Sequence, residues 1–306
     1  MNYNRIMPGA KSIHFKDCID GGFIGVDFDI KEDVSMFLTD NPNDFKNKYR
    51  PVFLKNRPNK SKVAAGLACG AIWTVCHSLK QGDIVLCPDG RGEYSVGEIE
   101  SNYYYVKDEI LQHRRKVNWK RNTIRRSDMS EALRNSSGSV LTTCDLTKYN
   151  VELDGLINGN NSSPIVSNDN TIESASEFAL ERHLEDFLVK NWKKTTLGKK
   201  YNIYEIDGEI VGQQFPSDTG PIDILALSKD KKTFLVVELK KGRVSDNVVG
   251  QIQRYMGYVK QDLAEKNQEV KGVIIGFEDD VKIQRALSVA NNIDFYKYKV
   301  DFKLYK

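Results

Sequence analysis

The amino-acid sequence predicts a two-domain protein of mixed α and β structure, an α+β module followed by an α/β domain. In the second half of the chain, two apolar runs (221–227 and 234–240) lie between segments whose apolar residues follow a helical period. Residues 158–170 are rich in Asn, Ser and Gly and show no period, as expected of a linker. A length of 306 residues is ample for two domains.

These features divide the chain into three parts. We place the first domain at residues 1–155, a linker at 156–172 and the second domain at 173–306. No apolar run approaches the roughly 18–20 residues that cross a membrane, and the N-terminus has no apolar signal core. The five cysteines form no C-x-x-C pair and indicate free thiols in a reducing compartment. We therefore expect a cytoplasmic protein with no membrane contact.

The first domain is expected to be mostly strands with a few helices. Segments 60–79 and 34–49 have the apolar spacing of helices, and the second of these is interrupted at Asn41-Pro42. Alternating or continuous apolar runs flanked by Gly and Asp predict strands. These strands are expected at 22–28, 81–87 and 94–106.

A basic segment from His113 to Arg126 follows, with seven Lys and Arg residues, no acid, and a central Trp119. Each basic group that neutralises a phosphate releases counterions, so such a run favours nucleic-acid binding. A Trp can also stack on an unpaired base. In the structural alternative, Val117 and Trp119 are two apart in a strand and both point into the core. The candidate nucleic-acid contacts are His113, Arg114, Arg115, Lys116, Trp119, Lys120 and Arg121.

Several stretches of this domain resemble the PUA/EVE-like small β-barrels, which occur in front of nucleases in modification-dependent restriction and phage-defence proteins. The stretches lie within residues 20–145 and read GAIWTV, LKQGDIVLCPDGRGEYSVGEI, NYYYV and HRRKVNW. The resemblance implies a pocket for a flipped base or a nucleotide, and extrusion of a base costs a few kcal/mol that stacking must offset. Each candidate for this pocket has a structural alternative, in the core or in a turn. The candidates are Trp73, Tyr94, Tyr104, Trp119, His113, Asp83 and Asn118.

In the second domain, an acid in each apolar run points to a metal site. Residues two apart in a strand share a face, so Glu238 and Lys240 project together. The polar segment 228–233 predicts a hairpin that brings Asp223 beside Glu238. Two neighbouring carboxylates repel each other unless a cation lies between them, and hard oxygen ligands suit Mg²⁺ or Mn²⁺.

This D…ExK pattern resembles the PD-(D/E)xK nuclease superfamily. The order of helix, strands, ELK strand and second helix is similar to that of the C-terminal catalytic domain of the NucS endonuclease family. The similarity covers about residues 173–300, in the stretches LEDFL, GPIDILAL, VVELK and QIQRYMGYV. It implies a restriction-endonuclease-like α/β core with Mg²⁺ or Mn²⁺ as cofactor.

The resemblance implies a role for each matching residue. Asp223 and Glu238 would be metal ligands, and Lys240 would orient or deprotonate the attacking water. Glu185 would support the metal from the upstream helix. Glu181, one turn earlier on the same helix face, is the alternative for that carboxylate.

Further matches lie on the downstream helix. Gln251 corresponds to a polar residue beside the ELK strand, and Arg254 and Tyr255 extend that face towards DNA. The usual Pro-Asp dipeptide is Ile222-Asp223 here, with the proline shifted by one place to Pro221.

The leading expectation is a metal-dependent DNA endonuclease in restriction or phage defence. Its N-terminal module would read DNA, including a modified base, and the protein would be a homodimer. One alternative is a repair endonuclease for mismatched or branched DNA. The other is a nucleotide-ligand-gated effector or non-enzymatic sensor. The net charge of +3 is too small to decide among them.

Overall fold

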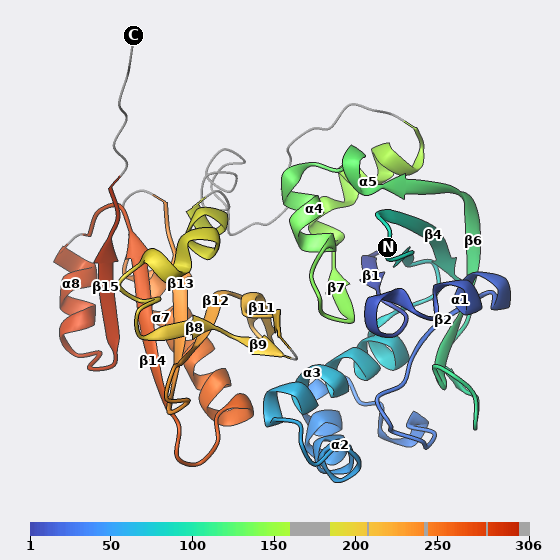
Figure 1. Cartoon of the computed structure of the whole chain (residues 1–306), viewed down its shortest axis with the longest axis horizontal. Helices are drawn as coiled ribbons and strands as arrows, with labels where there is room; N and C mark the ends of the chain where they lie inside the picture. Colours follow the sequence, from blue (N-terminus) through green and yellow to red (C-terminus); the bar gives the residue numbers. More distant parts are fainter. Residues whose placement is uncertain (160–183, 207, 242–243, 280, 300–306) are drawn as a thin grey trace. The chain divides into compact units, whose positions relative to one another are not determined.

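Figure 1 shows the computed structural model, which describes residues 1–159, 184–206, 208–241, 244–279 and 281–299. The chain divides into two compact units, Met1–Ala175 and Ser176–Lys306. Most of the expected linker 156–172 lies outside the described residues, and so does Glu181. None of the described helices is both long enough and apolar enough to cross a membrane.

The first unit is built on a seven-stranded sheet in the order β2-β6-β4-β3-β1-β7, with β5 paired to β6. All of these pairs are antiparallel except β1 with β3, which are parallel. The strand order is open in the described part of the chain, so the sheet is a half-barrel and the PUA/EVE-like barrel is not confirmed. Its strands are β1 (Tyr3–Ile6), β2 (Phe23–Val26), β3 (Ile84–Pro88), β4 (Glu93–Ile99), β5 (Tyr104–Tyr105), β6 (His113–Arg125) and β7 (Thr143–Asp145).

Local capping sets where the helices of this unit begin. Asn41 accepts a hydrogen bond from the Asn43 amide (3.0 Å) with Pro42 in the first turn, so helix α2 starts here and not at 34. Ser61 caps α3 through the Ala64 amide (3.2 Å). The helices are α1 (Phe15–Gly21), α2 (Pro42–Asn56), α3 (Lys62–Trp73), α4 (Glu131–Ser137) and α5 (Asn150–Ile157).

Strand β3 shows why this sheet is apolar on both faces. Val85 and Cys87 pack in one core cluster with residues of α1, α2 and α3, whereas Ile84 and Leu86 pack in another with residues of α4 and α5. Alternate residues of a strand face opposite sides. The sheet is therefore covered on both faces, and an unbroken apolar run is the expected sequence for its central strand.

The basic strand β6 begins inside the protein. His113 is fully buried, and its Nε2 lies 2.8 Å from the Ile30 carbonyl oxygen. A carbonyl can only accept, so Nε2 carries the hydrogen and Nδ1 accepts from the Tyr103 hydroxyl at 3.0 Å. Burial lowers the pKa of His113, so the imidazole is neutral in the folded protein.

The second unit contains a six-stranded mixed sheet in the order β11-β12-β13-β14-β15, with β8 also paired to β12. Strands β11, β12 and β13 are antiparallel, and β13, β14 and β15 are parallel. The β12–β13 pair confirms the predicted hairpin. The strands are β8 (Tyr201–Ile203), β11 (Gln213–Ser217), β12 (Gly220–Ser228), β13 (Thr233–Leu239), β14 (Glu269–Gly276) and β15 (Ile293–Lys297), with a separate pair β9 (Glu205–Ile206) and β10 (Glu209–Ile210).

Helix α7 (Asn247–Tyr258) lies against β13 and β14, while α8 (Val281–Ser288) precedes β15. The contact of α7 with the sheet depends on Gly272, where a Cβ would collide with the side chains of Met256 and Ile252. A third helix runs through residues 184–191. Helix α7 and helix 184–191 supply the side chains that meet the ends of β12 and β13.

Acidification should weaken the fold through His113. The unfolded chain takes up a proton near the ordinary histidine pKa of about 6.5, and the folded protein takes it up only at a lower pH. Stability is therefore retained above this pH and lost as the pH falls below it, by up to about 1.4 kcal/mol per pH unit. Urea unfolding at pH 7 and pH 5 should show a larger loss for the wild type than for His113→Gln.

The matched control is Asn118→Gln, at an exposed position later in the same strand that carries no ionisable group. Its loss of stability between pH 7 and pH 5 should equal that of the wild type. An equal loss for His113→Gln and the wild type would contradict a neutral, buried His113.

Candidate active site

Three sequence-predicted residues meet where β12 and β13 pair. Lys240 Nζ lies 2.9 Å from Glu238 Oε1, and the Glu238 side chain is 2% exposed. Asp223 Oδ2 accepts a hydrogen bond of 2.7 Å from the Leu239 amide on the neighbouring strand. The structure therefore brings Asp223, Glu238 and Lys240 together, with one charge pair and one backbone bond fixing their arrangement.

Glu185 reaches the same place from helix 184–191. Its Oε2 accepts a hydrogen bond of 2.5 Å from Gln214 Nε2, and the same nitrogen donates to Asp223 Oδ1 at 3.1 Å. Gln213 Nε2 donates to Glu185 Oε1 at 2.7 Å and to Asp186 Oδ1 at 2.9 Å. Glu185 is buried, and its two oxygens are both bound by amides from β11.

Sequence reasoning missed Gln213 and Gln214. The feature that indicates them is a pair of amide side chains, directly after Gly212, on a strand whose neighbour carries Asp223. Polar residues in a largely buried sheet need hydrogen-bond partners, and the nearest acids are those of the site.

Tyr255 belongs to this cluster and not to the outer surface. It is 4% exposed, and its hydroxyl accepts a hydrogen bond of 3.2 Å from Gln251 Nε2. Burial raises the pKa of Tyr255, and the nearby negative charges of Glu238 and Asp223 raise it further, against the opposite effects of Gln251 and Lys240. The phenol therefore stays protonated and can donate a hydrogen bond.

The first residue of β12 is fitted closely against this phenol. Gly220 has φ +124°, where side chains are rarely found, and a Cβ there would lie 3.2 Å from the Tyr255 hydroxyl. Arg254, which was predicted to extend the same face, is exposed.

The oxygen donors of the site are of the kind that Mg²⁺ and Mn²⁺ bind. Within the residues that the structure describes, however, no three His, Cys, Asp or Glu side chains converge closely enough to hold a metal. At Glu185 and Asp223, the Gln214 amide nitrogen is within hydrogen-bond distance of one oxygen of each carboxylate. The carboxylates of Asp223, Glu238 and Glu185 are therefore suitable ligands for a divalent cation. The Gln214 amide lies between two of them, Glu185 and Asp223.

The basic segment of the first unit is divided between the interior and the surface. Besides His113, two of its arginines are buried: Arg114 is 8% exposed and Arg115 is 4% exposed. Arg115 donates to the carbonyls of Val75, Cys76 and Ser101 at 2.7–3.1 Å. The prediction that these three side chains contact nucleic acid is corrected, because all three hold internal segments together.

The predicted base-stacking tryptophans are also tied to the fold. Trp119 Nε1 donates to the Cys18 carbonyl at 3.0 Å, and its ring packs against Gly97, where a Cβ would overlap it. Trp73 Nε1 donates to the Thr39 carbonyl at 3.1 Å. The structure thus favours the alternative in which Trp119 points towards the core.

Other pocket candidates serve turns and packing. Tyr94 is buried, with its hydroxyl 3.3 Å from Ser137 Oγ. Asp83 accepts from the amides of Asn2 and Lys80 at 2.7 and 3.0 Å. Asn118 is exposed and Tyr104 is half-buried.

The exposed part of the segment is a bulge. Between the pairs Ser95↔Thr123 and Gly97↔Trp119, β4 advances by two residues while β6 advances by four. Lys120 and Arg121 lie in this bulge and are exposed, and Lys116 is exposed earlier in the strand. A bulge directs its side chains away from the regular sheet face, so these cations are available to a partner.

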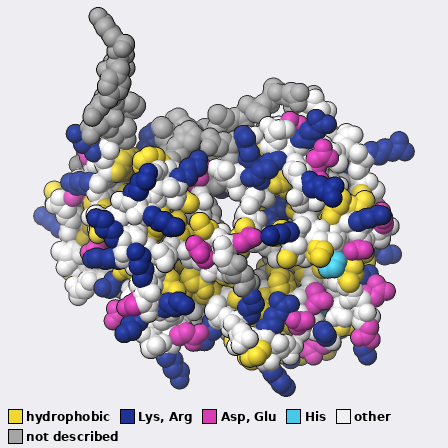
Figure 2. Space-filling view, viewed as in Figure 1, with side chains coloured by type: hydrophobic (Ala, Val, Ile, Leu, Met, Phe, Trp, Pro, Cys, Tyr) yellow, Lys and Arg dark blue, Asp and Glu magenta, His cyan; other side chains and the backbone are white. Residues whose placement is uncertain are grey.

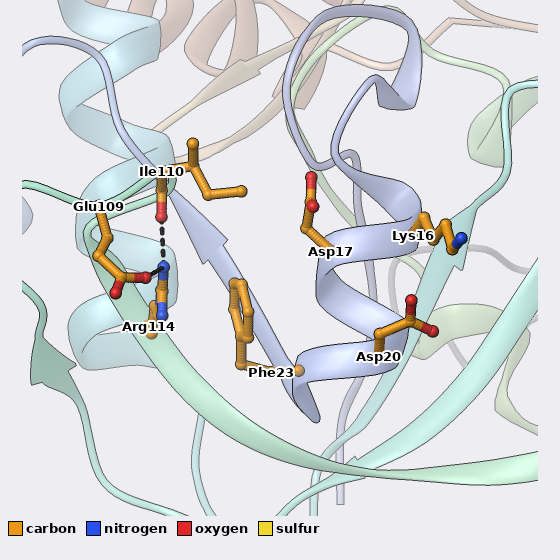
Figure 3. A pocket seen from close by; sticks show the side chains of 8 residues that line it. Lys16, Asp17, Asp20, Phe23, Glu109, Ile110 and Arg114 are labelled. Atoms are coloured by element: carbon orange, nitrogen blue, oxygen red, sulfur yellow. Dashed lines mark hydrogen bonds and ion pairs between the residues drawn. The ribbon is translucent and has the colours of Figure 1, made fainter.

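One cleft of the first unit is lined by more carboxylates than cations. It measures about 560 Å³ and is drawn in Figure 3, where Asp17, Asp20 and Glu109 face it together with Lys16. Arg114 lies over the Phe23 ring at 4.0 Å and pairs with Glu109 at 3.0 Å. Apart from this ion pair, two carboxylates face the cleft with one cation, Lys16, and this excess of negative charge does not suit a phosphate. Figure 2 shows Lys and Arg interspersed with Asp and Glu over the face it presents.

Two family models match the chain. Residues 5–147 match a domain of unknown function (DUF8426), and residues 180–299 match the Endonuclease NucS C-terminal domain. The C-terminal unit is therefore similar to the NucS C-terminal domain, as its sequence indicates, whereas the PUA/EVE-like resemblance of the first unit is not confirmed. No curated protein matches the chain.

Three solved structures show a distant likeness. The EndoMS-dsDNA2 complex is 11% identical, with a TM-score of 0.31, over 69% of this chain and 62% of that one. A repair endonuclease from Pyrococcus abyssi is 14% identical, with a TM-score of 0.30, over 69% and 66%. EndoMS in its apo form is 16% identical, with a TM-score of 0.28, over 39% and 45%. The chain thus spans less than two thirds of the length of each.

Proposed function

We propose that the chain is a metal-dependent DNA endonuclease that hydrolyses phosphodiester bonds at the site of Asp223, Glu238 and Lys240. The observation that carries the proposal is the buried Glu238 carboxylate, which pairs with the partly exposed Lys240 beside Asp223 inside a NucS-like domain. A buried carboxylate at a strand end costs stability even when an ammonium group pairs with it. Its chemistry suits phosphoryl transfer.

The side chains divide the chemistry among themselves. Asp223 and Glu238 would hold Mg²⁺ or Mn²⁺, with Glu185 in support, and the bound ion would lower the pKa of water and offset charge on the phosphate. Lys240 orients the attacking water and stabilises the charge that develops on the phosphate oxygens. The water oxygen bonds to phosphorus, the bond from phosphorus to the 3′ oxygen breaks, and a proton reaches the departing oxygen.

Neutral Tyr255 and Gln251 form the wall of the site on helix α7. The Tyr255 phenol can donate to a phosphate oxygen because its raised pKa keeps its proton in place and, in the described part of the chain, its hydroxyl acts as an acceptor from Gln251. Exposed Arg254 extends this face as a contact for the DNA backbone.

The first unit would bind DNA through the exposed cations of β6, namely Lys116, Lys120 and Arg121. Contacts of this kind position the duplex and do not read its sequence. The role that we favour is restriction or phage defence, with a modified base as the feature recognised. The alternative role is repair, which agrees with the repair endonuclease among the similar structures.

A panel of matched DNAs separates these roles. Unmodified, methylated, hydroxymethylated, mismatched and branched duplexes would be incubated with the protein in Mg²⁺ and in Mn²⁺. Cleavage confined to modified DNA supports restriction, and cleavage confined to mismatched or branched DNA supports repair. A protein that cuts none of them but binds a free nucleotide would support the sensor alternative.

Asp223→Ala, Glu238→Ala and Lys240→Ala should each reduce cleavage by about 10²-fold or more, since each removes a group that acts on the transition state. The three act as a unit, so the losses should not add in a double variant. Single-turnover cleavage measures the effect. The matched controls Asp230→Ala and Lys232→Ala, in the turn at the other end of the same hairpin, should cut at the wild-type rate. Lys240→Ala that cuts at that rate would contradict the assignment.

DNA affinity should depend steeply on salt through the β6 bulge. Lys120→Ala and Arg121→Ala should each make the log–log slope of affinity against salt shallower by about one unit, if each cation neutralises one phosphate. Fluorescence anisotropy of a labelled duplex in EDTA measures the slope. Lys55→Ala, an exposed lysine on α2, should leave it unchanged. Unchanged slopes for both bulge variants would remove the bulge from the DNA interface.

A further inference from the structure

The Gln214 side chain fills the space between two carboxylates of the site. Its single amide nitrogen lies 2.5 Å from Glu185 Oε2 and 3.1 Å from Asp223 Oδ1. A primary amide nitrogen carries two hydrogens, so it can donate to both oxygens at once. This nitrogen therefore takes the place where a cation shared by these two acids would lie.

The backbone of Gln214 is held in an uncommon conformation to reach that place. Its φ is +47°, in the left-handed region that residues other than Gly and Asn seldom adopt. Neighbouring side chains of a regular strand point to opposite faces, yet the Gln213 and Gln214 amides both bind Glu185. The change of φ within β11 is what brings both amides to one carboxylate.

Both carboxylates have other hydrogen-bond donors, so the Gln214 amide can be displaced from between them. If the Gln214 amide moved away, Glu185 would keep Gln213 on its other oxygen, and Asp223 would keep the Leu239 amide. Gln214 is half-buried, so the displaced amide can reach water. Displacement would break two hydrogen bonds and no part of the sheet.

We propose that Gln214 is a positioning residue that exchanges with the divalent cation. In the metal-free protein its amide separates Glu185 from Asp223, and it withdraws when the cation binds. This inference rests on the proposed metal-dependent function. It predicts the direction of the effect on metal binding: the amide competes with the cation and lowers the affinity of the protein for it. A Gln214 whose amide turned to offer Oε1 as a ligand would have the opposite effect.

The test is a titration of the full-length protein with Mn²⁺ in the absence of DNA, with free Mn²⁺ followed by electron paramagnetic resonance. Gln214→Gly removes the amide at a backbone position that glycine adopts without strain. Its Kd for Mn²⁺ should fall by about tenfold or more, because the two hydrogen bonds from this amide to carboxylates no longer have to break. Gln214→Asn tolerates the same φ but is shorter, and its Kd should also fall.

Melting temperature gives a second measurement. The rise from EDTA to saturating Mn²⁺ should be larger in Gln214→Gly than in the wild type, since tighter binding adds more stability to the folded state. The matched control is Gln284→Ala on helix α8. This substitution removes a side-chain hydrogen bond of 3.1 Å from the Gln284 amide to Asp279. Its Kd for Mn²⁺ and its melting-temperature rise should equal those of the wild type.

The outcomes separate this inference from the proposed function. An unchanged Kd in Gln214→Gly would overturn the exchange, and a weaker one would make Gln214 a ligand. In both cases the metal site itself would stand. If Asp223→Asn and the wild type bind Mn²⁺ equally, or neither binds it, the metal site fails and the exchange fails with it.

Discussion

The buried carboxylate of Glu238 is the constraint on which the second unit depends. A carboxylate with a 2% exposed side chain is strongly destabilising in an apolar strand unless a partner offsets the charge. Lys240 supplies that partner two residues later, on the same face of the chain. Pairing of β13 with β12 and β14 then fixes both side chains beside Asp223. The geometry of the proposed active site therefore costs stability.

The first unit uses positive charge in another way. Arg5 is 1% exposed and donates to the carbonyls of Ser139 and Leu141 at 2.5 Å, and to that of Thr142 at 3.3 Å. Arg115 likewise binds three carbonyls. Guanidinium groups with several donors in a plane suit this task, since one side chain can satisfy a whole turn of backbone. By contrast, Lys116, Lys120 and Arg121 of β6 are exposed, and the last two lie in the bulge.

The features that could be predicted from the sequence are those that depend on residues close together in the chain. The Asp223, Glu238 and Lys240 site follows from a period of two and a hairpin turn, which are local properties of the chain. The sequence could not predict that the side chains of Gln213 and Gln214 both reach Glu185. The direction of the Gln214 side chain depends on a positive φ, and no feature of the sequence indicates one at this position. The half-barrel depends on pairing of β1 with distant β3 and β7, and the expected barrel rested on local strand patterns alone. Burial of His113 and Arg115 is likewise decided by distant partners.

The central claim is that Asp223 and Glu238 share a divalent cation. Anomalous X-ray diffraction from crystals equilibrated with Mn²⁺ tests it most directly, because the peak locates the ion independently of activity. The account predicts a peak about 2.1 Å from a carboxylate oxygen of each residue. A saturated crystal with no peak at these two carboxylates, or with its peaks only at other sites, would contradict it.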